Sequence, residues 1–305
     1  MRIVFMGTPS FAVPSLNALL QSGHSVVGVF TQPDRPKGRG KKTQASPVKA
    51  RAAEAGIPVF QPQKIRLDGL DAFRALEPDL CVTAAFGQII SQEMLDIPVH
   101  GCINVHASLL PGHRGASPVA HAIMSGDRKT GVTTMKMDAG IDTGPILLQS
   151  ETEIGETETC EELTERLSHT GAELLIQTLK SLEEGTLKEI PQDESRMTYD
   201  PMLTKDLSDI DFHLSAVRVC GLINGLNPWP CASLPLQNGR LKLMRAAVTE
   251  GTGAPGAILT ADHRQGLKIA CGDGAVQILE LQAPGGKVLR SEDYLRGHNL
   301  DKELL

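Results

Sequence analysis

The stretch GCINVHASLLP, residues 101–111, is a short apolar run that carries an asparagine and a histidine and then stops at SLLP. Three other segments are continuously apolar and read as strands: RIVFMG, HSVVGVFT and PDLCVTAAF, at residues 2–7, 24–31 and 78–86. Helical patterns separate them: FAVPSLNALLQSG, SPVKARAAEAG and LDGLDAFRALE, at residues 11–23, 46–56 and 67–77. This alternation predicts an α/β fold with a doubly wound, mostly parallel, Rossmann-like sheet.

The same alternation continues to about residue 184. SPVAHAIMSG at 117–126 reads as a helix, and TGVTTMKM and GPILLQSETEI at 130–137 and 144–154 read as further strands. A long helix follows from about Thr159 to Glu184, and Glu162 offers a capping box to Thr159. We therefore expect one domain over residues 1–184.

The chain changes character after this helix. Residues 185–208 are polar and irregular, which predicts a linker. One helix, SAVRVCGLINGL, then leads to NPWP, and short alternating strands with glycine turns follow: CASLPL, RLKLMRAA, GAILT, GLKIAC and AVQILEL. This pattern predicts a small OB-like β-barrel domain over residues 209–305.

Composition limits the class of protein. The 305 residues are 41% apolar and 22% charged with a formal charge of −6, which is typical of a soluble globular protein and not of one that coats nucleic acid with its whole surface. No stretch approaches the ~20 apolar residues that span a bilayer, and the first apolar run is too short for a signal peptide, so we expect a cytoplasmic protein without membrane association. The cysteines are scattered without a CxxC pair, so we expect no metal site. We also expect a monomer.

Asn104 and His106 are the first candidate site residues. Side chains two residues apart on a strand point to the same face, so these two should meet one spot at the end of a strand, where ligands of such sheets bind. The loop MDAGIDTGPIL, residues 137–147, carries Asp138 and Asp142 and can return beside His106. An amide can hold a developing oxyanion, a histidine can donate to it or move a proton, and a carboxylate can orient the histidine.

This trio suits acyl-type transfer, in which a tetrahedral intermediate must be stabilised. No serine or cysteine is placed as a nucleophile, so the nucleophile would come from the substrate. The alternative is structural, because a single histidine is more often a hydrogen-bonded core residue, and the aspartate of Asp-Thr-Gly is more often a turn former.

Two basic segments are candidates for binding a polyanion. From Arg35 to Ala53 there are seven lysines and arginines and no acid, and the centre, RPKGRGKKTQ, predicts a mobile exposed loop. Such a loop beside a ligand crevice favours phosphate binding, although many charge runs are only solvated. Arg240 and Lys242 share one face of a predicted barrel strand. This face is either only solvent-exposed or extends a nucleic-acid-binding surface.

A nicotinamide cofactor is disfavoured. The first strand-to-helix turn, Met6-Gly7-Thr8-Pro9, lacks the GxGxxG fingerprint of dinucleotide-binding folds. We therefore expect no NAD.

The stretch NVHASLLP, with Asp142 lying 36 residues after His106 in DAGIDTG, resembles the folate-dependent formyltransferases. Their pattern is Asn-x-His-x-Ser-Leu-Leu-Pro plus an aspartate in a glycine loop. The basic DRPKGRGKK loop, the SPVK after it and the NPWP before the barrel narrow the resemblance to members that act on initiator tRNA, and it covers essentially the whole chain. It implies transfer of a formyl group from 10-formyltetrahydrofolate to the α-amino group of the methionine on initiator methionyl-tRNA, as a step of translation initiation.

The resemblance also implies roles for individual residues. Asn104, His106 and Asp142 would be catalytic. The folate pocket would be lined by the SLLP turn and two further segments, with these residues: Ser108, Leu109, Leu110, Pro111, Phe86, Gly87, Gln88 and Asp138. The tRNA would be contacted by the basic loop and the barrel, through these residues: Arg39, Lys41, Lys42, Arg240 and Lys242.

The chain departs from the family pattern in two places. Gly112-His113-Arg114-Gly115 stands where members commonly have Arg-Trp-Arg-Gly, and Pro145 stands where Thr-Gly is commonly followed by aspartate. Neither departure touches the trio, but the tryptophan's contact at the pocket mouth is lost.

Three alternatives remain. One keeps the formyl chemistry with an amino sugar or a glycinamide nucleotide as acceptor, or hydrolyses the formyl group. A non-enzymatic RNA-binding protein is disfavoured by the intact trio, and an NAD-dependent oxidoreductase by the missing glycine fingerprint.

Overall fold

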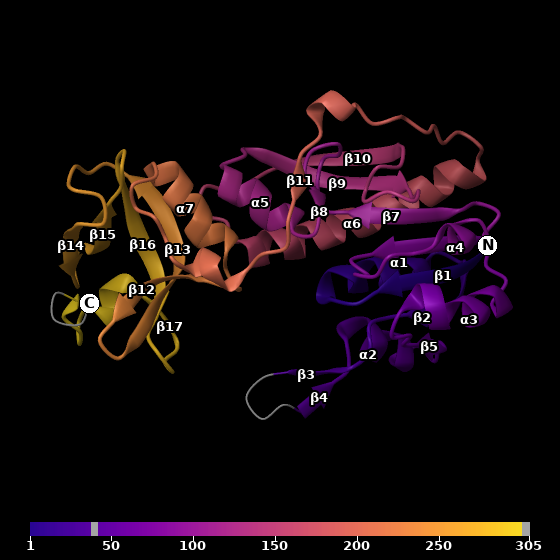
Figure 1. Ribbon diagram of the computed structural model, residues 1–305, viewed down its shortest axis with the longest axis horizontal. Coiled ribbons are helices and arrows are strands. Elements are labelled where there is room, and N and C mark those ends of the chain that lie inside the picture. Colours follow the sequence, from indigo (N-terminus) through magenta and orange to yellow (C-terminus); the bar gives the residue numbers. More distant parts are fainter. Residues whose placement is uncertain (38–41, 301–305) are drawn as a thin grey trace. The chain divides into compact units, whose positions relative to one another are not determined.

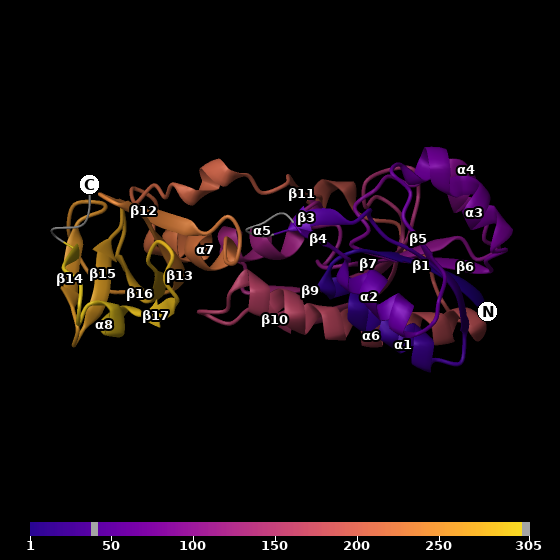
Figure 2. The same ribbon diagram turned by 90° about the horizontal axis from the view of Figure 1, so that it is seen from below.

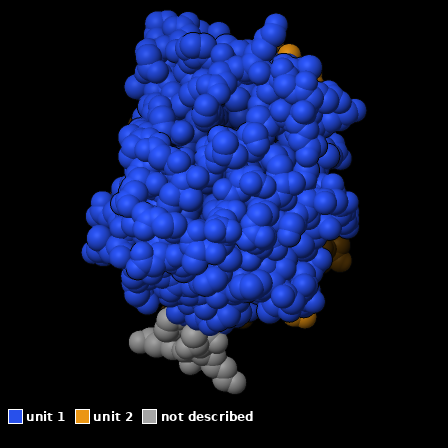
Figure 3. Space-filling view, turned by 90° about the vertical axis from the view of Figure 1, so that its right-hand side faces the viewer, with its two compact units in different colours: residues 1–115, 131–151, 164–199 blue, residues 116–130, 152–163, 200–305 orange. Residues whose placement is uncertain are grey.

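The computed structural model describes residues 1–37 and 42–300 of the chain (Figure 1). These residues belong to two compact units that interleave along the sequence (Figure 3). Unit 1 lies within residues 1–115, 131–151 and 164–199, and unit 2 lies within residues 116–130, 152–163 and 200–305.

Unit 1 is built on a seven-stranded sheet in the order β10-β9-β7-β6-β1-β2-β5. Its strands are β1 (Arg2–Gly7), β2 (Ser25–Phe30), β5 (Val59–Phe60), β6 (Leu80–Ala84), β7 (Cys102–His106), β9 (Lys129–Lys136) and β10 (Ile146–Glu153). The pairs from β5 to β7 are parallel, whereas β9 is antiparallel to β7. The predicted α/β fold with a mostly parallel sheet is confirmed. The strand order changes direction between β1 and β6, and ligands of such sheets bind beside this point.

Helices cover both faces of this sheet, which explains why its central strands are apolar along their whole length. Figure 2 shows α1 (Val13–Gln21), α2 (Pro47–Glu54) and α6 (Cys160–Glu183) below the strands, and α3 (Leu70–Ala75) and α4 (Gln92–Leu95) above them. Helix α2 begins after Ser46, whose hydroxyl accepts a hydrogen bond from the Lys49 amide at 3.1 Å. In the described part of the chain, none of the helices has the length and apolar character needed to cross a membrane.

Unit 2 contains the antiparallel sheet that the C-terminal sequence predicts. Its strands are β12 (Ala232–Leu236), β13 (Gly239–Thr249), β14 (Ile258–Asp262), β15 (Gly266–Ala270), β16 (Ala275–Gln282) and β17 (Val288–Arg290), followed by α8 (Ser291–Tyr294). The sheet encloses an apolar core that includes Leu241, Leu243 and Ile278. Helix α7 (Ala216–Gly225) packs on α5 (Pro118–Ser125). A Cβ at Gly221 would lie 2.6 Å from the Ile123 carbonyl oxygen, so this close approach requires glycine.

The segment predicted to be a linker is bound to unit 1 over part of its length. It contains short elements only: η3 (Glu194–Arg196), β11 (Tyr199–Asp200) and η4 (Lys205–Ser208). Ile190 and Ile146 exchange two backbone hydrogen bonds, at 2.8 and 2.9 Å, and the Arg114 amide donates to the Thr198 carbonyl at 2.9 Å. We call residues 190–199 the strap. Its polar composition did not indicate that it is fastened in this way.

The N-terminus of α6 has the predicted capping box. The Glu162 carboxylate accepts a hydrogen bond from the Thr159 amide at 3.0 Å, and the Glu162 amide donates to the Thr159 hydroxyl at 3.4 Å. The same carboxylate pairs with both ends of the Arg245 guanidinium, at 2.6 and 3.0 Å. The hydrogen bond from Arg245 is the main cause that lowers the pKa of Glu162 from 4.5 to about 2.

We expect Glu162→Gln to destabilise the protein by about 1 kcal/mol at neutral pH. Glutamine preserves the capping box but loses the charge that faces Arg245, and solvent screens this half-exposed pair. A carboxylate with a lowered pKa in the folded state stabilises the protein above its unfolded pKa, near 4.5, and this contribution is lost as the pH falls toward 2. The difference in unfolding free energy between the native protein and the variant, measured with urea, should therefore decrease as the pH falls below about 4.5. A difference that stays constant with pH would argue against the ion pair.

Candidate active site

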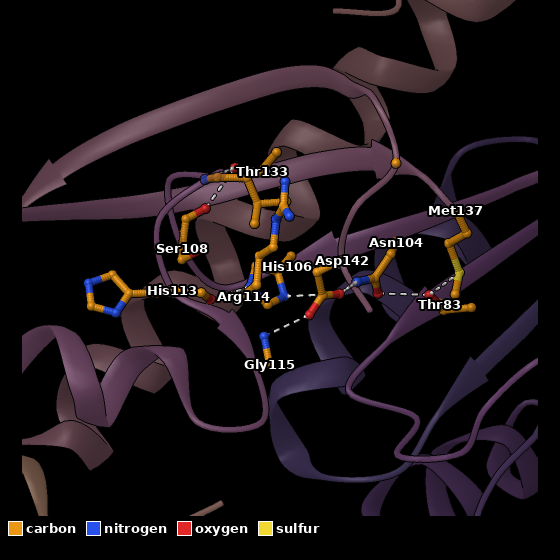
Figure 4. A network of polar contacts seen from close by, with 12 residues as sticks. Thr83, Asn104, His106, Ser108, His113, Arg114, Gly115, Thr133, Met137 and Asp142 are labelled. Carbon is orange, nitrogen blue, oxygen red and sulfur yellow. Dashed lines mark hydrogen bonds and ion pairs between the residues drawn. The ribbon is translucent and has the colours of Figure 1, made fainter. Parts of the chain in front are cut away.

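Strands β6 and β7 bring the polar side chains of the site together (Figure 4). The two strands are parallel neighbours, and Thr83 of β6 is the register partner of Asn104 of β7. Asn104 Nδ2 lies 3.5 Å from Asp142 Oδ1, and His106 Nδ1 lies 3.7 Å from the same oxygen. Asn104 and His106 therefore share one face of their strand, as their spacing predicts.

Asp142 reaches this face from the loop that follows β9. Because β9 is antiparallel to β7, it ends near the start of β7, where the Met137 amide donates to the Cys102 carbonyl at 2.8 Å. The loop then folds back, and the Gly115 amide donates to Asp142 Oδ2 at 2.9 Å. The φ angle of Asp142 is 54°. This left-handed conformation costs a non-glycine residue about 1 kcal/mol or more, so the surrounding contacts must hold it.

The orientation of the Asn104 amide is defined by Thr83. The Thr83 hydroxyl donates to Asn104 Oδ1 at 2.7 Å, so the Nδ2 donor faces Asp142. Thr83 is buried, and its Oγ1 also lies 3.3 Å from Met137 Sδ. Sequence reasoning missed Thr83. In the sequence, Thr83 stands out only as a hydroxyl within the otherwise apolar strand LCVTA. That this hydroxyl lies beside Asn104 follows from the register of β6 with β7, which the sequence does not show.

His106 is only 6% exposed. Its Nε2 lies 2.9 Å from the carbonyl oxygen of His113, and since a carbonyl only accepts, Nε2 carries a proton. The other nitrogen, Nδ1, faces Asp142. When both nitrogens are protonated, the ring is an ion-pair partner of Asp142 and presents its second N–H on the same side as the Asn104 amide.

The structure thus places the three residues of the predicted trio together, with two hydrogen-bond donors and one carboxylate on one strand face. Two donors can stabilise a negatively charged oxygen, and the imidazole–carboxylate pair can move a proton. This arrangement suits a reaction that passes through a tetrahedral oxyanion.

Most of the SLLP turn is buried. The Ser108 hydroxyl donates to the Gly112 carbonyl at 2.7 Å, and Gln149 donates to the Leu110 carbonyl at 2.9 Å. Ser108, Leu110 and Pro111 are buried, whereas Leu109 is partly exposed. The buried side chains of this turn therefore mainly stabilise its conformation. Leu109 and the backbone of the turn are the parts that a ligand could contact.

The Phe86-Gly87-Gln88 loop follows β6. Gln32 Nε2 donates to the carbonyls of Phe86 and Gly87 at 3.2 and 2.9 Å. Gln88 accepts from the Ile65 amide at 2.6 Å and so ties the loop to the segment before α3. Phe86 is buried and Gly87 is exposed with a φ of 75°. Gly87 is therefore the position where the backbone of this loop is open to a ligand.

Asp138 shapes the loop that carries Asp142. Its Oδ1 accepts from the Gly140 amide at 3.0 Å and from the Thr143 hydroxyl at 2.6 Å. Two isoleucines that the sequence did not single out are exposed on the candidate pocket loops, Ile141 to 54% and Ile89 to 67%. Exposed apolar side chains beside polar groups are typical of a small-molecule site.

The basic segment, which we expected to be a mobile exposed loop, contains a hairpin where the structure describes it. Strands β3 (Arg35–Lys37) and β4 (Lys42–Gln44) pair antiparallel. Arg39 and Lys41 lie outside the described residues, and Lys42 is described only through its backbone in β4.

Two cations of the basic run serve the fold. Lys49 Nζ donates to Asp34 at 2.6 Å and to Gln61 at 2.7 Å, and the bond from Lys49 lowers the pKa of Asp34. Arg51 donates to the Asn17 side chain at 2.5 Å. Lys49 and Arg51 are therefore engaged within unit 1.

Arg240 and Lys242 occupy exposed positions of β13 that alternate with buried leucines, so they share one face as predicted. Arg240 is partly engaged, because its Nε donates to Ser233 Oγ at 2.8 Å and its guanidinium pairs with Asp209. Arg245, on the same strand, is held by Glu162 and Glu280. Lys242 is thus the more open cation of this face.

Comparison with known families and proteins gives a consistent result. Residues 1–179 match the family described as formyl transferase, and residues 202–299 match the formyl transferase C-terminal domain. Among similar proteins, the methionyl-tRNA formyltransferase of Trichlorobacter lovleyi is 49% identical over 98% of this chain and 95% of its own length. That of Alkaliphilus oremlandii is 45% identical over 99% of this chain and 98% of its own.

Solved structures share the fold. The N-formyltransferase from Helicobacter canadensis, in complex with folinic acid and dTDP-3-aminofucose, has a TM-score of 0.70 at 18% identity and covers 90% of this chain and 97% of its own. HypX from Aquifex aeolicus, in complex with tetrahydrofolic acid, has a TM-score of 0.61 at 20% identity and covers 97% of this chain and 47% of its own. At these identities the likeness concerns the fold alone.

Proposed function

Because this chain belongs to the formyl transferase family, we propose that it transfers the formyl group of 10-formyltetrahydrofolate to the α-amino group of the methionine on initiator methionyl-tRNA. The observation that carries the proposal is the convergence of Asn104, His106 and Asp142 on one face of β7. This convergence occurs in a chain that is similar over nearly its full length to methionyl-tRNA formyltransferases. We propose that the enzyme acts as a monomer in the cytoplasm, where its tRNA substrate is charged.

In the proposed reaction the nucleophile is the substrate amine. Its lone pair attacks the formyl carbon, and the carbonyl oxygen becomes an oxyanion. Asn104 Nδ2 and the protonated His106 donate to this oxygen, and one such donor is typically worth about 3 kcal/mol of barrier. Asp142 faces both donors through the same oxygen, Oδ1, and so holds the imidazolium in place.

Collapse of the intermediate breaks the bond between the formyl carbon and the folate nitrogen. The attacking amine loses a proton and the folate nitrogen gains one, so the products are the N-formyl amide and tetrahydrofolate. We propose that Asp142 relays this proton through a water molecule. Oδ1 is the oxygen suited to the relay, because it faces Asn104 and His106, whereas Oδ2 accepts from the Gly115 amide.

We propose that the folate binds along three loops of unit 1: 86–88, 108–111 and 138–144. These loops present exposed backbone at Gly87, the partly exposed Leu109 and the exposed Ile141. A flat ring with polar edges suits such a combination of backbone groups and apolar side chains.

The basic hairpin and the exposed face of β13 are the proposed tRNA contacts, through Arg39, Lys41, Lys42, Arg240 and Lys242. We expect the double variant Lys41→Gln/Lys42→Gln to raise KM for tRNA several-fold while kcat is preserved, because phosphate contacts add affinity without entering the chemistry. The slope of log(1/KM) against log salt should become shallower by about 1 for each lysine lost.

The matched control is Lys180→Gln/Lys188→Gln, which removes two exposed lysines from the end of α6 and the residues after it. Its salt slope should equal that of the native protein. An unchanged slope in the hairpin variant would remove the hairpin from the tRNA interface.

The acceptor is tested by supplying 10-formyltetrahydrofolate with three acceptors in turn: methionine-charged initiator tRNA, uncharged tRNA and an amino-sugar nucleotide. Formylation of the charged tRNA alone supports the proposal. Formylation of the amino sugar would instead support the alternative in which the same chemistry serves another amine.

A further inference from the structure

The strap reaches the active-site loop through Gln192. Its Nε2 donates to the carbonyl oxygens of Asp142 at 2.8 Å and of Gly144 at 2.7 Å. These carbonyls lie within the segment whose backbone turns through the left-handed conformation of Asp142. The Gln192 side chain of the strap therefore binds the backbone of the segment that carries the catalytic Asp142 carboxylate.

The orientation of the Gln192 amide follows from the chemistry of its partners. Its Oε1 accepts from Arg114 Nε at 3.0 Å and from Arg114 Nη2 at 2.8 Å. A guanidinium only donates and a carbonyl only accepts, so the amide cannot be reversed without losing both sets of bonds. The Gln192 donor is thereby committed to the Asp142 loop.

Arg114 is itself fixed. Its side chain is 3% exposed, and its two terminal nitrogens pair with the two carboxylate oxygens of Glu194 on the strap, at 3.0 and 2.7 Å. This contact lowers the pKa of Glu194. A bidentate ion pair of this kind fixes the orientation of the guanidinium as well as its distance from the carboxylate.

Arg114 and its neighbour Gly115 thus hold Asp142 from two sides. The Gly115 amide binds the Asp142 carboxylate at Oδ2. Arg114 binds Gln192, which binds the Asp142 backbone. All of these residues belong to unit 1, and Figure 4 shows the contact between Gly115 and the Asp142 carboxylate beside His106.

We propose that Gln192, aligned by Arg114, is a positioning residue that fixes the Asp142 carboxylate against Asn104 and His106. This proposal rests on the proposed formyl transfer and adds to it a role for the segment between the two family domains. Gln192 thereby connects the strap to the active site, and its proposed effect acts through Asp142.

The first test reports on the position of Asp142 and does not depend on an activity assay. Amide hydrogen exchange at Gly115 reports its hydrogen bond to Asp142, so protection should be lost in Asp142→Ala, Gln192→Ala and Gln192→Glu. Gln192→Glu keeps the acceptor for Arg114 but turns an oxygen toward the two carbonyls. It therefore isolates the donor even if the alanine variant folds poorly. Glu189→Gln, which only removes an exposed ion pair with Lys136 beside the strap, should keep Gly115 protected.

The second test measures formyl transfer. We expect Gln192→Ala to lower kcat about 10- to 100-fold with little change in KM, as small misplacements of catalytic groups do. In the Asp142→Ala background the same substitution should change kcat less than about 2-fold, because two groups that act as one unit are not additive. A merely structural role would lower activity equally in both backgrounds.

Retained protection at Gly115, or equal losses of kcat in both backgrounds, would overturn the positioning role. If the native protein transfers no formyl group to any acceptor, the proposed function fails. The exchange measurement then still decides whether Gln192 holds Asp142.

Discussion

His106→Ala is expected to lower kcat for formyl transfer by at least ~100-fold, because a group that handles a proton in the transition state contributes ~10²–10⁴-fold. The ring is buried and held through Nε2, so its Nδ1 is fixed in place and faces Asp142. Its removal eliminates a donor to the oxyanion and leaves Asp142 without its cationic partner. KM for both substrates should change little, since these interactions form mainly in the transition state.

Steady-state kinetics with both substrates saturating measures this effect, together with circular dichroism of the variant. His106→Gln is a second variant that keeps an N–H for the His113 carbonyl but has no nitrogen at the Nδ1 position, so it should be equally slow with the fold intact. His169→Ala, on the exposed surface of α6, is the matched control and should behave as the native protein. A folded His106→Ala protein with near-native kcat would exclude His106 from the chemistry.

Asn104→Ala should lower kcat/KM by about 10²–10³-fold, the usual cost of removing one oxyanion donor. The amide is held by Thr83 with its Nδ2 aimed at the site, so little reorganisation is needed when the oxyanion forms. Asn104→Asp should be at least as harmful, because it replaces a donor by a second carboxylate beside Asp142 and beside the developing negative charge.

Comparison of the two Asn104 variants with Asn17→Ala separates chemistry from general damage. Asn17 lies on α1 and binds only Arg51 among the contacts described for its side chain, so its loss should leave kcat/KM unchanged. If Asn104→Ala raised KM and left kcat intact, Asn104 would be a residue of substrate binding only.

The fold was predictable where local pattern and tertiary environment agree. Strands β1, β6 and β7 are buried on both faces, and continuous apolar runs report this directly. Strand β5 and helix α4 span only Val59–Phe60 and Gln92–Leu95, which is too short for a period to appear. The antiparallel direction of β9 depends on the path of the chain between strands, which hydrophobic pattern does not encode.

The site was predictable to the extent that its residues share a motif. Asn104 and His106 lie on one strand, the glycine loop offered Asp138 and Asp142 as carboxylates, and the resemblance selected Asp142. The supporting residues are different, because Gln192 contacts Asp142 from 50 residues away in the chain. Arg114 and Gln192 are 78 residues apart, and nothing near either of them marks the partner. Ser108 lies in the loop expected at the folate pocket, and the motif does not indicate that its buried hydroxyl donates to the Gly112 carbonyl.

The central claim is that Asn104, His106 and Asp142 move a formyl group from folate to the amine of charged initiator tRNA. The most direct measurement follows an isotope-labelled formyl group from 10-formyltetrahydrofolate, with the native protein and His106→Ala side by side. We expect the label on the methionine amine with the native protein, and at least ~100-fold more slowly with the variant. Label released as formate, or equal rates for the two proteins, would contradict the account.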